Sequence, residues 1–189
     1  MRLLLALVCS VLTLPALGQE SGPDPRVRVV TSLGEFVVRL DPGRAPLTVE
    51  AFLKLVDSGF YEGTIFHRVI AGFVAQAGGY TPQLELKPVE GNIFNESGNG
   101  LSNMRGTVGL ARANEPHSGT TQFYINLADN LDLNPRPTRW GYAVFGTVEE
   151  GMDVIDRIGD VATSSGGPFD AAVPVTPVLI EAIERIPTP

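Results

Sequence analysis

Hydrophobic and polar positions alternate with a period of two over most of the chain, which indicates strands with one buried face. The runs RVRVVTS and GEFVVRL meet at a tight turn around Ser32, Leu33 and Gly34, and together they predict a first hairpin. Shorter runs of the same kind predict strands at TIFHRVI, FVAQAG, GTVGLAR, TQFYINL and YAVFGTV, and VTPVLIEAIERI predicts a last one. The chain is therefore predicted to be mainly β.

Two segments depart from this alternation and predict helices. In APLTVEAFLKLVDSGF, apolar residues recur at helical spacing, with Pro46 near the start and Gly59 at the exit. In EEGMDVIDRIGD, helical spacing places Met152, Ile155 and Ile158 on one face. We expect these two amphipathic helices to cover the ends of a β structure.

Many short strands with only two helices favour a closed antiparallel β-barrel, because closure leaves no exposed strand edge. A β-sandwich is the competing architecture. The longest stretch of low regularity, residues 79–106, is predicted to be a functional surface loop rather than a linker. A chain of 189 residues, of which 43% are hydrophobic, is expected to form a single domain.

Residues 1–18 have the pattern of a secretory signal peptide. Arg2 precedes an apolar run over residues 3–14, and small residues lead to an exit near Gly18. Cleavage near Gly18 would place the mature protein outside the cytoplasm, in a periplasm or secreted. An uncleaved signal anchor is the alternative.

Composition excludes several kinds of chemistry. The only cysteine, Cys9, lies in the predicted leader, so thiol chemistry and disulfides are not expected in the mature chain. His67 and His117 are the only histidines, so a metal site would need several carboxylates around them, and neither a metal nor another cofactor is expected. The net charge of −7 and the lack of a basic cluster disfavour nucleic acid as a partner.

One arginine lies where a charged side chain is costly. Arg68 interrupts the stretch FHRVIAGFVAQAGG, which is otherwise rich in apolar residues and predicts strands that become buried. Removing an unpaired charge from water costs several kcal/mol. With no serine-hydrolase elbow in the sequence, Arg68, Gln76 and apolar neighbours suit a reaction that breaks no covalent bond.

Three ordered blocks, FHRVIAGFVAQAGG, GTVGLARANEPHSGTTQFYINLADN and GYAVFGTVEEGMDVID, resemble the signature blocks of the cyclophilins, a family of peptidyl-prolyl cis-trans isomerases. The similarity runs over residues 27–186, after a short extension at 19–26. The segment GLARANEPHSGTTQF, the run NLADN and the signal-peptide pattern resemble exported bacterial members in particular. The resemblance implies an eight-stranded antiparallel barrel capped by two helices. It also implies catalysed rotation about X-Pro peptide bonds, in aid of the folding of exported proteins.

The resemblance implies which residues of this chain form the family's site. The catalytic arginine corresponds to Arg68, and the substrate-binding positions are Phe73, Val74, Gln76, Ala111, Arg112, Gln122, Tyr124, Leu133 and Tyr142. Four positions depart from residues common in the family, with Val74 in place of methionine, Tyr124 of phenylalanine, Arg112 of asparagine and Tyr142 of histidine. Asp132 stands directly before Leu133, where relatives sensitive to the inhibitor cyclosporin carry a tryptophan.

The expected partners follow from the same resemblance. They are unfolded or partly folded polypeptides that contain proline, with no nucleic acid and no stable membrane partner, and the protein is expected to be a monomer. A rival hypothesis is a proline-peptide binding module, or a chaperone that holds its client without turning it over. Arg68 and Gln76 together favour catalysis, because binding alone needs only an apolar pocket.

Overall fold

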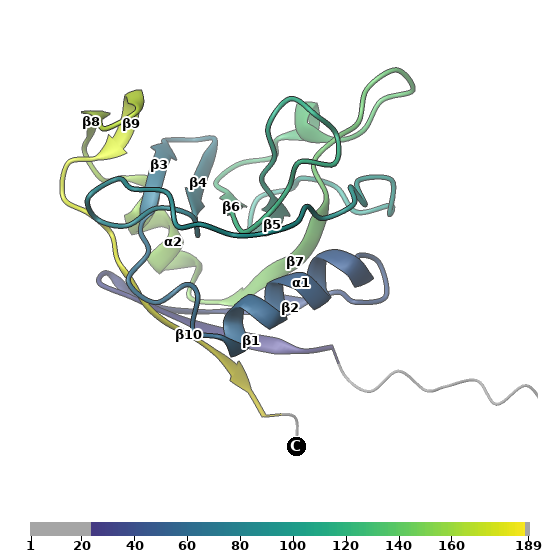
Figure 1. Cartoon of the computed structure of the whole chain (residues 1–189), viewed down its shortest axis with the longest axis horizontal. Helices are drawn as coiled ribbons and strands as arrows, with labels where there is room; N and C mark the ends of the chain where they lie inside the picture. The colour runs from purple at the N-terminus through teal and green to yellow at the C-terminus, as the bar shows by residue number, and fades with distance from the viewer. Residues whose placement is uncertain (1–23, 188–189) are drawn as a thin grey trace, which may run out of the picture.

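The structure is a computed structural model that describes residues 24–187 of the chain, so the predicted leader at 1–18 lies outside the described residues. Ten strands, two α-helices and one 3₁₀ helix follow one another in this part (Figure 1). Their bounds are β1 Arg26–Thr31, β2 Gly34–Leu40, α1 Pro46–Asp57, β3 Phe66–Ile70, β4 Val74–Ala77, β5 Thr107–Leu110, β6 Phe123–Asn126, η1 Leu131–Leu133, β7 Val144–Glu150, α2 Met152–Gly159, β8 Thr163–Gly166, β9 Phe169–Pro174 and β10 Ile180–Ile186.

Eight of the strands form one curled antiparallel sheet, in the order β10-β1-β2-β7-β5-β6-β4-β3. These are the eight strands that the period-two runs predict, and the first hairpin closes with Thr31 opposite Gly34. Alternate residues of the strands point inward, so the core lies inside the curl, with Phe36, Phe66 and Phe145 almost fully buried.

The prediction of a closed barrel is wrong in one respect, because the two edge strands β3 and β10 form no ladder. The chain segments that precede them meet at a single bridge between Ile65 and Leu179. Beyond that bridge the edge of β3 is covered by another element, since Phe169 of β9 lies against His67 with ring centroids 5.5 Å apart. The sheet edge is therefore protected by a covering hairpin instead of by closure.

The covering hairpin, β8 and β9, is a separate two-stranded sheet that the sequence analysis does not predict. Its residues, TSSGGPFDAAVP over 163–174, are largely polar or small and show no clear alternation. Most of β8 is exposed. The position of the hairpin thus depends on the residues it packs against, and these contacts cannot be read from the local sequence pattern.

The two predicted helices are present and pack on the sheet. Val49, Phe52 and Val56 of α1 are buried at helical spacing, as are Val154 and Ile158 of α2. In Figure 1, α1 crosses in front of the β1 and β2 side of the curl, while α2 lies behind β3 and β4. Within residues 24–187, no helix is both long enough and apolar enough to cross a membrane.

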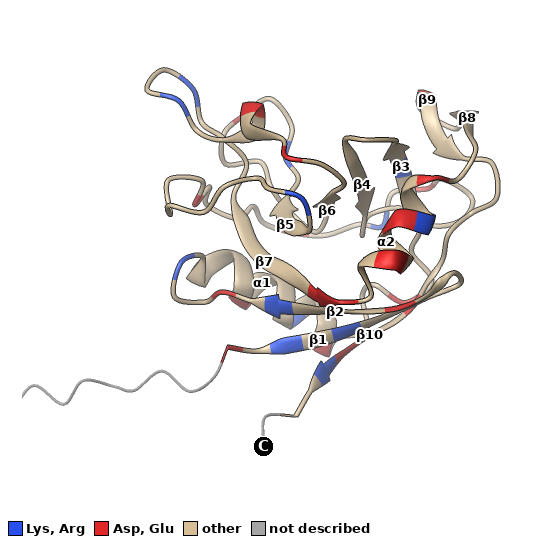
Figure 2. Cartoon of the chain, turned by 180° about the vertical axis from the view of Figure 1, so that it is seen from behind, with Lys and Arg blue, Asp and Glu red and all other residues tan. Residues whose placement is uncertain are grey.

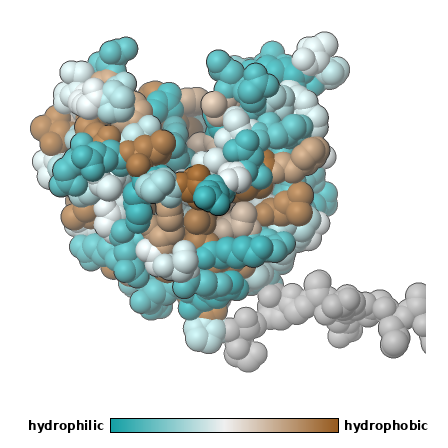
Figure 3. Space-filling view, in the orientation of Figure 1, coloured by the Kyte–Doolittle hydropathy of each residue, from teal (hydrophilic) through white to brown (hydrophobic). Residues whose placement is uncertain are grey.

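The segment 79–106 runs over the surface without regular strands, as predicted (Figure 1). Leu86, Val89 and Phe94 in it are exposed. The space-filling view of the same side shows apolar side chains scattered among polar ones (Figure 3).

Charged residues occur along β1, β2, β10 and α2 (Figure 2). Several form ion pairs, such as Arg39 with Asp24 and Glu149 and Arg105 with Asp156.

Candidate functional site

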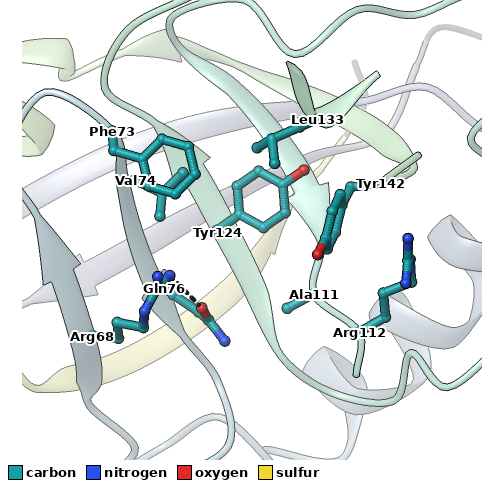
Figure 4. A pocket seen from close by; sticks show the side chains of 9 residues that line it. All are labelled: Arg68, Phe73, Val74, Gln76, Ala111, Arg112, Tyr124, Leu133 and Tyr142. Carbon is teal, nitrogen blue, oxygen red and sulfur yellow. Dashed lines mark hydrogen bonds between the residues drawn. The ribbon is translucent and has the colours of Figure 1, made fainter. Parts of the chain in front are cut away.

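A pocket of about 370 Å³ opens on the face of the sheet formed by β3, β4 and β6, beside the loops that follow β5 and η1 (Figure 4). The side chains that line it are Arg68, Phe73, Val74, Gln76, Ala111, Arg112, Tyr124, Leu133 and Tyr142. These are nine of the ten positions that the resemblance singles out. The tenth, Gln122, lines an adjoining pocket that shares Gln76, Ala111 and Arg112 with the first.

The apolar part of the pocket comes from neighbouring strands and one turn. Val74 begins β4, Tyr124 lies in β6, and both are almost fully buried. Phe73 precedes β4, and Leu133 ends η1 on the opposite side (Figure 4). Tyr142 completes the wall, since its backbone N–H donates to the Leu133 carbonyl at 2.9 Å. The result is a half-enclosed apolar cup that suits a small ring.

The polar side of the pocket is a row of three side chains. Arg68 and Gln76 are paired residues of β3 and β4, and Arg68 Nη1 donates to Gln76 Oε1 at 3.3 Å. Gln76 Nε2 in turn donates to Gln122 Oε1 at 2.9 Å. None of the ion pairs among residues 24–187 involves Arg68. No carboxylate among these residues therefore offsets the charge of the guanidinium, and most of its N–H donors remain available for a ligand.

Arg112 does not use its guanidinium in the same way. Its three nitrogens donate to backbone carbonyls of two loops, at 113–114 and 140–141, over 2.9 to 3.2 Å. The guanidinium carbon also lies 4.5 Å from the centroid of the Tyr142 ring, on the side away from Tyr124 (Figure 4). The side chain of Arg112 thus ties the two loops together and supports Tyr142 from behind.

The floor carries a polar group that sequence reasoning did not use. The Tyr124 hydroxyl donates to Asn103 Oδ1 at 2.6 Å, and Asn103 is completely buried. Burial raises the pKa of the Tyr124 hydroxyl, so the group stays a donor. Gly109 makes room for the phenol, because a Cβ there would lie 2.3 Å from the Tyr124 oxygen. Asn103 has no local sequence signal, but Asn126 at the end of the buried strand FYIN hints at a polar network.

His67, next to Arg68, is a buried residue of the same edge strand. Its ring lies 4.5 Å from that of Tyr80, and its Nδ1 finds no hydrogen-bond partner in the described part of the chain. Burial lowers the pKa of His67 to about 4 against a hydrogen bond to Ile65 that raises it, so the imidazole is neutral at pH 7. Across residues 24–187, no group of three or more His, Cys, Asp or Glu side chains could hold a metal ion.

Comparisons with known proteins agree on one family. The family model described as "Cyclophilin type peptidyl-prolyl cis-trans isomerase/CLD" matches residues 26–185. The peptidyl-prolyl cis-trans isomerase cyp18 of Streptomyces antibioticus is 52% identical over 82% of this chain and 95% of its own length. Peptidyl-prolyl cis-trans isomerase A of Dickeya dadantii is 43% identical over 97% of both chains.

A further relative and a solved structure extend the likeness. Peptidyl-prolyl cis-trans isomerase B of Escherichia coli is 46% identical over 81% of this chain and 94% of its own. A crystal structure of a cyclophilin type peptidyl-prolyl cis-trans isomerase of Cryptosporidium parvum superposes with a TM-score of 0.72. It covers 88% of this chain and 99% of its own at 24% identity, which is a likeness of fold.

Proposed function

This chain belongs to the cyclophilin-type peptidyl-prolyl cis-trans isomerase family, and from that premise we propose that Arg68 is the catalytic residue of its isomerase site. Enzymes of this class rotate X-Pro peptide bonds, and the chain is such an enzyme. The observation that carries the proposal for Arg68 is its position. The guanidinium is held by a neutral glutamine, without a carboxylate partner among the described residues, at the rim of an apolar pocket.

The chemistry explains why an arginine suffices. Resonance in the X-Pro amide gives a barrier of roughly 18 to 20 kcal/mol and exchange over tens to hundreds of seconds. Rotation removes the resonance, and the prolyl nitrogen becomes pyramidal and regains a lone pair. A donor aimed at that nitrogen binds the twisted transition state better than the planar ground state, which lowers the barrier. Arg68 is protonated at any working pH, so it is always such a donor.

The other side chains of the site would fix the two ends of the rotating bond. The cup of Phe73, Val74, Tyr124 and Leu133, with Tyr142 on its wall, would bury the proline ring. Gln76 and Gln122, with the backbone at Ala111 and Arg112, would hold the chain that precedes the proline. Without both anchors the peptide would turn as a whole, and the amide would not twist.

The experiment compares two arginines of the same protein. Arg68→Ala should lower kcat/KM for an Ala-Pro peptide by about 100-fold or more, the scale of losing one transition-state donor. Arg28→Ala is the matched control, because Arg28 is an exposed residue of β1 that only faces Glu35 at 3.8 Å. A folded Arg68→Ala protein with turnover near that of Arg28→Ala would refute the role of Arg68.

We also propose that the enzyme assists the folding of exported proteins outside the cytoplasm, as a monomer whose folded domain spans 27–186. The support is the leader pattern at residues 1–18, followed by a short extension at 19–26. The mature protein from the periplasm or medium should begin near Gln19, by N-terminal sequencing. A protein that keeps its leader, or stays with the membrane fraction, would contradict this location.

A further inference from the structure

Asn103 is a fully buried side chain behind the pocket, and it does not line the pocket itself. It lies in the segment before β5, in the stretch NGLSNMRG, which sequence reasoning treats as loop. A buried amide is costly unless each of its polar groups is bonded. The bonds that Asn103 makes therefore indicate what it holds in place.

One end of the Asn103 amide is bonded to the floor of the pocket. Its Oδ1 accepts the Tyr124 hydroxyl at 2.6 Å and Asn126 Nδ2 at 3.2 Å. Tyr124 and Asn126 both belong to β6, which is paired with β5 and β4 on its two sides, so this end is fixed to an interior strand of the sheet.

The other end is bonded to the wall. Asn103 Nδ2 donates to Asn134 Oδ1 at 3.0 Å and to the Tyr142 carbonyl at 3.4 Å. The backbone N–H of Asn103 also donates to Asn134 Oδ1, at 2.8 Å, and its carbonyl accepts from Asn130 N–H at 2.7 Å. Asn130 and Asn134 flank η1, whose last residue is Leu133.

No residue of η1 is buried, so hydrogen bonds rather than apolar packing hold this wall. Arg112 holds its far end at the 140–141 carbonyls, and Asn103 holds the end next to the floor. A long turn separates Leu133 from Tyr142, and the Tyr142 N–H donates to the Leu133 carbonyl across it at 2.9 Å. Asparagine is the side chain that suits the junction, because it offers an acceptor to the tyrosine and a donor to the loop at once. Aspartate would lack the donor, and leucine would lack both.

We propose that Asn103 is a positioning residue of the isomerase, which sets the distance between the Tyr124 floor and the Leu133–Tyr142 wall and so the fit of the proline ring. This inference rests on the proposed function and assigns a role to the chain's own polar network. Because the network does not touch β3, it should act on substrate binding and leave the Arg68 step alone.

The test separates KM from kcat. Tyr124→Phe removes only the hydroxyl, and Asn103→Ala removes the whole junction. Each should raise KM for a proline tetrapeptide about 3- to 10-fold, the scale of one or two buried hydrogen bonds, with kcat within about twofold. The double variant should be no worse than Asn103→Ala alone, because both changes break the same link.

Tyr61→Phe is the matched control. It also deletes a buried tyrosine hydroxyl, which donates to the Thr121 carbonyl at 2.9 Å, but it lies outside the pocket lining. Tyr61→Phe should leave KM unchanged. The Leu133 methyl NMR signals should shift in Tyr124→Phe and stay in place in Tyr61→Phe.

Wild-type KM in Tyr124→Phe, or an equal rise in Tyr61→Phe, would overturn the inference. If Asn103→Ala does not fold, the KM of Tyr124→Phe is the deciding measurement, because that variant keeps the aromatic ring and loses only the hydroxyl. The outcome is independent of the Arg68→Ala result, so failure of this role and failure of the catalytic proposal are told apart.

Discussion

Arg68 and Gln76 face each other across the β3–β4 pair, with Arg68 Nη1 3.3 Å from Gln76 Oε1. A neutral amide orients the guanidinium and leaves its charge uncompensated, whereas a carboxylate in the same place would neutralise that charge. Gln76 Nε2 in turn donates to Gln122 Oε1 at 2.9 Å, so Gln122, which directly precedes β6, helps to fix the orientation of Arg68. The charge of the site and its geometry are therefore controlled by different groups.

Arg68→Lys keeps the charge and loses the planar fork. A single ammonium has no fixed geometry that serves both Gln76 and a prolyl amide, so kcat/KM should fall about 10- to 100-fold. The protease-coupled peptide assay measures this, with the unfolding midpoint as a check on folding. Full activity in Arg68→Lys would mean that charge alone is sufficient.

Cyclosporin should inhibit this enzyme poorly. Asp132 is exposed and bound by Arg136, and it offers no aromatic surface where sensitive relatives carry a tryptophan. The only tryptophan, Trp140, packs against His117 with ring centroids 5.1 Å apart. Losing a hydrogen bond and part of an aromatic contact amounts to roughly 100-fold in affinity. Asp132→Trp should tighten inhibition and leave turnover nearly unchanged, and nanomolar inhibition of the natural sequence would contradict the account.

Stability should fall as the pH drops below about 6.5. Burial lowers the pKa of His67 to about 4, so between these values the unfolded chain binds a proton that the folded chain does not. Between pH 7 and pH 5, protonation of His67 in the unfolded chain lowers the free energy of unfolding by about 2 kcal/mol. Urea titrations at both pH values measure the loss.

His67→Gln should remove that part of the loss, and His117→Gln, at the only other histidine, should retain it. An unchanged pH dependence in His67→Gln would show that other groups carry it.

Glu96 caps α1 from a distant part of the chain. Its carboxylate accepts from the N–H groups of Leu47 and Thr48 at 3.1 and 2.8 Å, and from the Thr48 hydroxyl at 2.7 Å. The helix begins after Ala45, which has no side chain that could cap it. Glu96→Ala should therefore lower the free energy of unfolding by about 1 to 2 kcal/mol. Glu90→Ala, an exposed residue of the same loop, is the control, and equal stability of the two variants would contradict the cap.

Local pattern was sufficient for the elements of the main sheet and for both helices. Strands are recognised by apolar residues at every second position, and helices by apolar residues at every third or fourth position. Both patterns arise because one face of the element is buried, and both can be read from a short stretch of sequence. The three sequence blocks carried the resemblance to the family, and that resemblance indicated the residues now found around the pocket. The β8–β9 hairpin was not predicted, because β8 is largely exposed and burial in β9 does not alternate, so neither strand has a period-two pattern.

Tertiary structure decided what depends on partners distant in the chain. Phe169 covers the open edge of β3 from roughly a hundred residues further along the chain, and neither segment has a sequence pattern that predicts this contact. Arg112 turned out to bind loop carbonyls, and Asn103 to join the floor to the wall, because hydrogen bonds depend on positions of individual atoms in space. A sequence fixes which groups are available to bond, but only the folded chain brings a donor within 3 Å of its acceptor.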